Sequence, residues 1–203
     1  MENAKKKPSK GKKISTSTVV GIGLLTAIVI VLQFISMALR FGNFSITLTL
    51  IPIVVGAALY GIKTGAWLGF VFGAAVLLTG DAASFLTVNV PGTIATVLVK
   101  GTMAGLCAAV VYRLIAKKNE IIAVLVSSIA APIVNTGIFL LGCRIFFYDT
   151  VKAWGEGLGF ENAFVYMIVG LVGINFLIEL GTNLVLNPAI LRIIKIGRKK
   201  LIK

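Results

Sequence analysis

Long apolar runs alternate with short polar segments along almost the whole chain. A helix needs about 20 apolar residues to cross a lipid bilayer, and fewer where the bilayer is thin. Runs of about that length cover residues 18–39, 46–62, 64–80, 93–116, 121–147 and 163–191. Backbone groups inside a bilayer must hydrogen-bond within the protein, so these runs are expected to be helices. The pattern predicts an all-α integral membrane protein, a compact bundle of six transmembrane helices.

Composition agrees with this prediction, and the charges give the bundle a direction. The 203 residues are 58% hydrophobic and 13% charged, with a mean hydropathy of +1.00, which is outside the range of soluble domains. Most of the 20 Lys and Arg residues lie in the basic tails, residues 1–17 and 192–203, and in the connections on the same side. Cytoplasmic segments are enriched in Lys and Arg, so both termini are expected in the cytoplasm and the protein in the cell membrane.

The opposite side of the predicted bundle carries few cations, namely Arg40, Arg144 and Lys152, whereas Lys100 falls within a span. The cations form short blocks between apolar runs and no continuous basic face, so no nucleic-acid partner is expected. The apolar run at residues 18–39 has no cleavage pattern after it and is interpreted as a retained first span.

The residue types that catalysis and metal binding usually need are scarce. The chain has no His, the usual general base at neutral pH. Its two Cys residues lie far apart in separate apolar runs, and its acids are not clustered, so neither a disulfide framework nor a metal site is expected. The sequence therefore predicts a protein that is not an enzyme and that has no cofactor of its own.

Glycines recur every four residues in the third run. Gly61, Gly65, Gly69 and Gly73 would form one line along a helix, where a neighbouring backbone can approach closely. Gly101 with Gly105, and Gly23 with Ala27, repeat this spacing in other spans. Such faces are expected to pack the bundle or to bind a partner helix. Pro52, near the start of the second run, fits the first turn of a helix.

The segment ITLTLIPIVVGAALYGIKTGAWLGFVFG, after a short first loop and a first span with a small-xxx-small pair, resembles the substrate-binding S component of energy-coupling factor (ECF) vitamin transporters. The resemblance implies a six-helix bundle that holds one vitamin near its outer face. It also implies that the first helix docks on a transmembrane coupling subunit, which two cytoplasmic ATPases drive with ATP. Gly23 and Ala27 would be the docking residues.

The sequence itself is compatible with this function. The chain is short for a self-sufficient transporter, and GAALYGIKT at residues 56–64 departs from the spacing of a nucleotide-binding P-loop. A partner that supplies the energy is therefore the simplest interpretation. The alternatives are a stand-alone secondary transporter and a small membrane scaffold protein.

Polar side chains within spans are costly and therefore mark candidate ligand contacts. Lys100 lies deep in the fourth span, Asn135 and Thr136 lie near the middle of the fifth, and Arg144 lies near its outer end. A pocket lined by these residues would suit a carboxylate or phosphate together with hydroxyls or amides. Pantothenate is the preferred vitamin on this ground, with riboflavin or another B vitamin as the alternative. Lys100 could instead pair with an acid such as Asp81, and Arg144 could anchor the helix at the membrane surface.

The sixth span carries a polar stripe, Asn175, Glu179 and Asn183, on one helical face. Asn175 is a candidate ligand contact, Asn183 is expected to pack between helices, and a direct pair between Lys100 and Glu179 is not expected from their depths. The outer segments 41–45 and 81–92 have the composition of a lid, with Asn43, Asn89 and Phe85 as contacts. Tyr148 and Trp154 are expected in the aromatic belt at the membrane surface.

Overall fold

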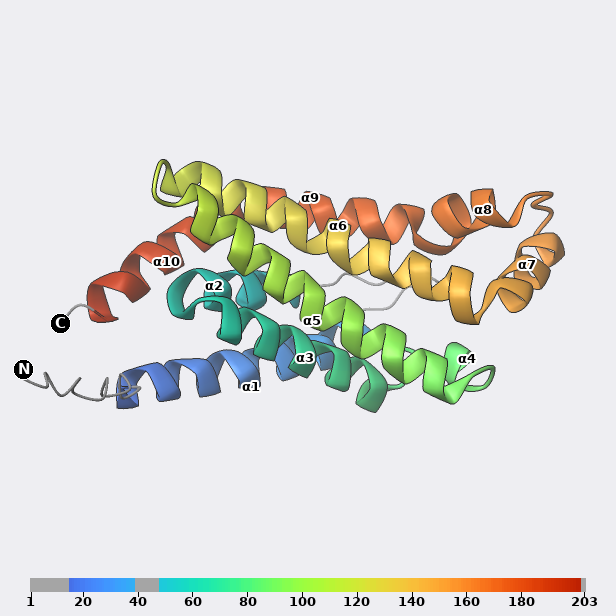
Figure 1. Ribbon diagram of the computed structural model, residues 1–203, viewed down its shortest axis with the longest axis horizontal. Helices are drawn as coiled ribbons and strands as arrows, with labels where there is room; N and C mark the ends of the chain where they lie inside the picture. The colour runs from blue at the N-terminus through green and yellow to red at the C-terminus, as the bar shows by residue number, and fades with distance from the viewer. Residues whose placement is uncertain (1–14, 39–47, 202–203) are drawn as a thin grey trace, which may run out of the picture.

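The computed structural model describes residues 15–38 and 48–201, and throughout these ranges the regular structure is helical (Figure 1). This confirms the all-α prediction. Asn43 lies outside the described residues. The elements are α1 (Thr16–Ala38), α2 (Leu50–Tyr60), α3 (Ile62–Thr79), α4 (Ala83–Leu86), α5 (Val90–Ile115), α6 (Glu120–Phe146), α7 (Tyr148–Gly157), α8 (Ala163–Val165), the π-helix η1 (Tyr166–Gly173), α9 (Ile174–Val185) and α10 (Asn187–Leu201).

Five helical segments are long and apolar enough to cross a membrane: α1, α3, α5, α6 and the continuous stretch Ala163–Val185. The second expected span is shorter. Helix α2 has 11 residues, which corresponds to about 16 Å at 1.5 Å per residue, against about 30 Å of hydrocarbon. The structure thus fits a multi-pass membrane protein, and a count of six crossings remains a prediction.

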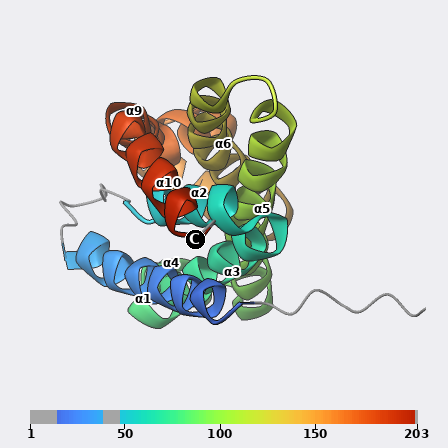
Figure 2. The ribbon, with the colours of Figure 1, turned by 90° about the vertical axis from the view of Figure 1, so that its left-hand side faces the viewer.

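The short helix α2 lies in the middle of the bundle. Viewed along the bundle, it is surrounded by α1, α3, α5, α6 and α10 (Figure 2). Leu50, Ile53 and Val54 are completely buried, which explains why this segment is apolar on every side. Pro52 is the third residue of α2 and is buried, as expected for a proline in the first turn of a helix.

The glycine line of α3 packs against α5 at backbone distance. A Cβ atom at Gly65 or Gly69 would overlap the carbonyl oxygens of Gly105 and Gly101 respectively, and one at Gly73 would lie 2.7 Å from the carbonyl oxygen of Val97. The expected packing role of these glycines is therefore observed, and we call this contact the glycine seam. Gly61 is not part of it. It forms the turn between α2 and α3 with a φ of 89°, which side chains other than glycine rarely adopt.

The last apolar run is interrupted near its end. It was expected to continue to Leu191, but α9 ends at Val185 and α10 begins at Asn187. Pro188 cannot continue a preceding helix and is tolerated only in the first turn of the next one, which accounts for the break. Helix α10 is amphipathic, because Ile190 and Ile194 are fully buried while the cations beside them are exposed.

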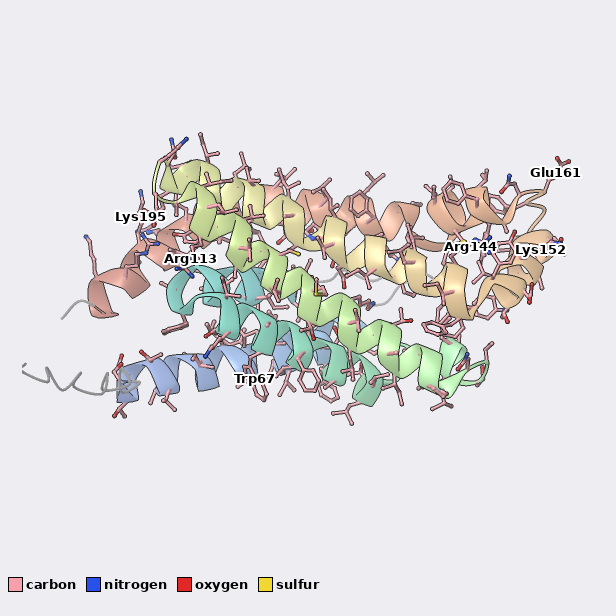
Figure 3. The ribbon with its side chains drawn as sticks, in the orientation of Figure 1. Trp67, Arg113, Arg144, Lys152, Glu161 and Lys195 are labelled. Carbon is pink, nitrogen blue, oxygen red and sulfur yellow. The ribbon has the colours of Figure 1, made fainter. Side chains whose placement is uncertain are left out.

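The beginning of α1 and the end of α10 lie at the same end of the bundle (Figure 1). Arg113 and Lys195 lie at this end, whereas Arg144, Lys152 and Glu161 lie at the opposite end (Figure 3). We call these the inner and outer ends, following the orientation that the sequence predicts.

Candidate ligand-binding site

The outer half of the bundle contains a cavity of about 350 Å³, within the size range of small-molecule sites. Its walls come from α3, α5, α6, η1 and α9, with Gln33 of α1 and the segment around α4 at its mouth. Elements from the whole length of the chain therefore build the site. Four of the predicted ligand contacts in the spans line it: Lys100, Asn135, Thr136 and Asn175.

The floor of the cavity is formed by Lys100 of α5, Asn135 of α6 and Glu179 of α9. Lys100 lies about 15 Å along the helix axis from Val90, where α5 begins. Its Nζ atom lies 5.1 Å from the centre of the Phe139 ring and 6.0 Å from that of Phe72, so the ammonium group is held by cation–π contacts.

Two acids act on this ammonium group without forming a salt bridge with it in the described part of the chain. Asp81 and Glu179 both attract Lys100 electrostatically, and both line the cavity. A direct Lys100–Glu179 pair was not expected from their depths, and none is observed between these two described residues. The two side chains nevertheless line the same cavity, Lys100 from α5 and Glu179 from α9.

Three buried polar atoms in the cavity wall have no hydrogen-bond partner among the described residues: Asn135 Oδ1, Glu179 Oε1 and Thr96 Oγ1. Their residues are 7%, 6% and 5% exposed respectively. Asn135 of α6 and Glu179 of α9 both line the cavity, so the two unpartnered oxygens border the same space. Buried polar atoms without partners are rare in proteins, and here all three border an open space.

Aromatic rings cover the outer part of the cavity. Phe85 of α4 makes edge-to-face contacts with Phe139, Phe147 and Trp154, at ring-centre distances of 5.4, 5.0 and 5.4 Å. The segment expected to form a lid therefore does contribute Phe85 to the cavity. Trp154 was expected in the membrane-surface belt, but it lines the cavity instead, because α7 folds back over the outer end of the bundle (Figure 1).

Arg144 and Asn89 do not line the cavity. Arg144 is exposed, and its guanidinium lies 4.3 Å from the centre of the Tyr148 ring, as expected for an anchor at the surface. The Asn89 side chain accepts a hydrogen bond of 2.9 Å from the backbone N–H of Gly92 and so caps the start of α5. Gly23 and Ala27 are exposed on α1.

Sequence reasoning missed Gln33. This residue of α1 is 2% exposed, lines the cavity and donates a hydrogen bond of 3.4 Å from Nε2 to Asp81 Oδ2. It also accepts a hydrogen bond of 3.5 Å from Thr49 Oγ1. The signal was present, because Gln33 is a polar residue within an apolar span. The hydroxyl residues Thr93 and Thr96 of α5 were missed in the same way.

The cavity combines several kinds of polar group that could contact a small molecule. Among the residues the structure describes, no group of three or more His, Cys, Asp or Glu side chains could hold a metal ion. A cation, two carboxylates, amides and hydroxyls line one cavity beneath aromatic rings, as in specific small-molecule sites.

Comparison with protein-family models finds one that matches residues 17–191, nearly the whole chain, and that describes the substrate-specific component of ECF transporters. Comparison with curated proteins and with solved structures finds no significant match. The family match agrees with the membrane-spanning helices and with a cavity shaped for a small molecule. The chain belongs to the family of ECF transporter substrate-specific components.

Proposed function

We propose that this protein captures a water-soluble vitamin outside the cell and passes it inward while docked on a transmembrane coupling subunit that two cytoplasmic ATPases drive. Members of this family are transporter subunits in a membrane and not enzymes. The observation that carries the proposal is the cavity in the outer half of the bundle, with Lys100, Asn135 and Glu179 at its floor. The cell membrane is the location that this function requires.

Two vitamins suit different parts of the cavity. Pantothenate would place its carboxylate at Lys100 and its hydroxyl and amide groups near Asn135 and Thr136, in charge-assisted and neutral hydrogen bonds. Riboflavin would place its flat ring against the aromatic walls, where Phe85, Phe139 and Trp154 lie. We favour an acid such as pantothenate because Lys100 is the one cation among the described residues that line the cavity.

Mass spectrometry of the small molecule that co-purifies with the detergent-solubilised protein would identify the ligand. Trp154 offers a second measurement, since a molecule that enters the cavity should change its fluorescence. The other tryptophan, Trp67, lies on the outside of α3 and can be removed by Trp67→Phe without touching the cavity. Absence of any bound organic molecule, together with no response of Trp154 to pantothenate or riboflavin, would contradict the proposal.

The role of Lys100 can be separated from that of the cavity as a whole. We expect Lys100→Met to weaken pantothenate binding by tenfold or more, since about 1.4 kcal/mol corresponds to a factor of ten. Panthenol, in which an alcohol replaces the carboxylate, should bind the wild type more weakly than pantothenate and should lose little affinity in the variant. Equal losses for both compounds would assign Lys100 a structural role instead.

Transport measurements distinguish this function from that of a stand-alone secondary transporter. The purified chain in liposomes should bind its vitamin but should not accumulate it. Accumulation should begin when the coupling subunit, the two ATPases and ATP are added. Uptake by the chain alone, driven by an ion gradient, would support the secondary transporter.

A further inference from the structure

We infer that Asn135 and Glu179 recognise a hydrogen-bond donor of the ligand, so that the head group bound at the floor carries an N–H or O–H beside an acceptor that faces Lys100. This inference rests on the proposed function and specifies the chemistry of its substrate. Imides, lactams, primary amides and hydroxy-carbonyl groups belong to this class. Head groups that offer acceptors alone do not, so pantothenate would belong to this class through its amide N–H or hydroxyl groups and not through its carboxylate alone.

Two buried acceptor oxygens at the floor of the cavity lack a donor in the described part of the chain. Asn135 Oδ1 and Glu179 Oε1 are each on a side chain more than nine-tenths buried, and neither has a donor among the described residues. A buried acceptor without a donor is destabilising, because the oxygen has lost its hydrogen bonds to water. A ligand with a donor replaces the lost hydrogen bond, whereas a ligand with acceptors alone would be repelled by these oxygens.

The described residues Lys100 and Glu179 line the same cavity without forming a salt bridge with each other. Lys100 offers three N–H donors and no acceptor, and the Glu179 carboxylate offers acceptors. No salt bridge joins them in the described part of the chain, although each feels the charge of the other. A ligand with donor and acceptor side by side can bridge the two, which a bare carboxylate cannot do.

Asn183, the next polar residue of the stripe on α9, has a different role from Glu179. Asn183 donates a hydrogen bond of 3.1 Å from its amide to the backbone oxygen of Glu179, and it does not line the cavity. Asn175 and Glu179 both line the cavity. The polar stripe of α9 therefore divides, with Asn183 packing within the bundle and Glu179 directed to the ligand.

Isothermal titration calorimetry with riboflavin and pantothenate would test the inference on Glu179→Met and Asn135→Leu. Ser127→Ala is the matched control: Ser127 lies on α6, is completely buried and has an unpartnered hydroxyl oxygen, but it does not line the cavity. We expect both floor variants to lose tenfold or more in affinity for whichever vitamin binds, and the control to change less than twofold. Glu179→Gln, which keeps one acceptor, should retain part of the affinity.

A matched pair of ligands tests the same point from the other side. Riboflavin carries an imide N–H between two carbonyl groups, and N3-methylriboflavin lacks this donor. If riboflavin binds, the wild type should bind the methylated analogue at least tenfold more weakly than riboflavin. The Glu179→Met variant should bind the two compounds equally well. Equal binding of the two compounds to the wild type would overturn the inference for this ligand class.

Thermal unfolding of the unliganded variants separates recognition from folding. The Glu179 Oε1 atom has no hydrogen-bond donor to lose, so what Glu179→Met removes is the electrostatic attraction to Lys100, with which Glu179 forms no salt bridge in the described part of the chain. We expect its Tm to fall by about 4 °C or less. A large fall in Tm that parallels the loss of affinity would show that Glu179 is structural and would overturn the inference.

The outcomes also distinguish this inference from the proposed function. A vitamin that binds the wild type with unchanged affinity in both floor variants would overturn the inference and leave the proposed function intact. If neither vitamin binds the wild type and no organic molecule co-purifies with it, the proposed function is wrong and the inference falls with it.

Discussion

Gly69 of α3 and Gly101 of α5 face each other so closely that a Cβ atom on either residue would overlap the backbone carbonyl oxygen of the other. The two helices are therefore in contact through their backbones. Gly65 and Gly105 form the same reciprocal contact one turn away. Close approach of this kind favours dispersion contacts between helices in a membrane, where there is no hydrophobic force between them.

We expect Gly69→Ala to destabilise the protein by about 2–3 kcal/mol, because the added methyl group meets a backbone that cannot move aside. Gly137→Ala is the control, since a Cβ atom there would have no neighbour within 4 Å. That change should be neutral or stabilise α6 by up to about 1 kcal/mol. Thermal unfolding in detergent measures both effects, and similar Tm values for the two variants would contradict a tight seam.

Helix α1 is predicted to dock on the coupling subunit, and the face of α1 that carries Gly23 and Ala27 is exposed. A Cβ atom at Gly23 would meet nothing within 4 Å of this chain. Gly23→Leu should therefore leave folding and vitamin binding unchanged, while it reduces uptake by the assembled transporter at least tenfold, because a large side chain prevents close approach of a partner helix.

Gly23→Ala is the matched control for this prediction. It keeps a small residue and spaces two alanines four residues apart, so uptake should be retained. Normal uptake by Gly23→Leu would exclude this face of α1 as the docking surface.

At the inner end of the bundle, Arg198 of α10 contacts Tyr112 of α5 and Glu120 of α6. Its Nη1 atom lies 2.9 Å from Glu120 Oε1, and its Nη2 atom donates a hydrogen bond to the Tyr112 hydroxyl. The Arg198 and Glu120 side chains are 41% and 26% exposed, and pairs this accessible contribute at most about 1 kcal/mol. We expect Arg198→Gln to lower the Tm only slightly but to speed amide hydrogen exchange in α10.

Lys195→Gln is the control for the Arg198 variant, since Lys195 lies on the same helix without an ion pair to another described residue. The effect of Arg198→Gln should diminish at high salt, which screens the pair in the wild type. Equal exchange rates in the two variants would show that Ile190 and Ile194 alone hold α10 in place.

The orientation of the bundle can be tested by cysteine labelling. In a Cys107→Ala, Cys143→Ala background, Lys152→Cys at the outer end should react with a membrane-impermeant maleimide in intact cells. Lys118→Cys, in the connection between α5 and α6, should react only after permeabilisation. The reverse pattern, or labelling of both from outside, would contradict cytoplasmic termini.

Much of the fold could be predicted because the relevant signals are local. The four-residue glycine spacing predicted the approach of α3 to another helix, and Pro52 predicted the start of α2. Hydropathy could not predict the π-helix η1 or the length of α2. Both depend on how the segment packs against its neighbours, and an apolar run looks the same whether it faces lipid or the protein interior.

The site was predicted in part, by the cost of polar groups in a bilayer. Depth alone selected Lys100 and Asn135, which line the cavity, and it also selected Arg144, which does not. Asn135, Phe139 and Cys143 lie at intervals of four residues on one face of α6, and Arg144 lies about 100° further round the helix. The depth of a residue along its span therefore has to be combined with the side of the helix on which it lies before the residue can be assigned to a cavity.

The glycine seam should make one side of the cavity rigid. Phe72 and Lys100 stand on two helices whose backbones are in contact, so we expect the distance between them to change little. If the cavity binds a vitamin as proposed, we expect entry and exit to displace α4, α7 or η1 instead. The wall formed by α3 and α5 would then be a stationary frame, and the opposite wall and the roof would contain the gate.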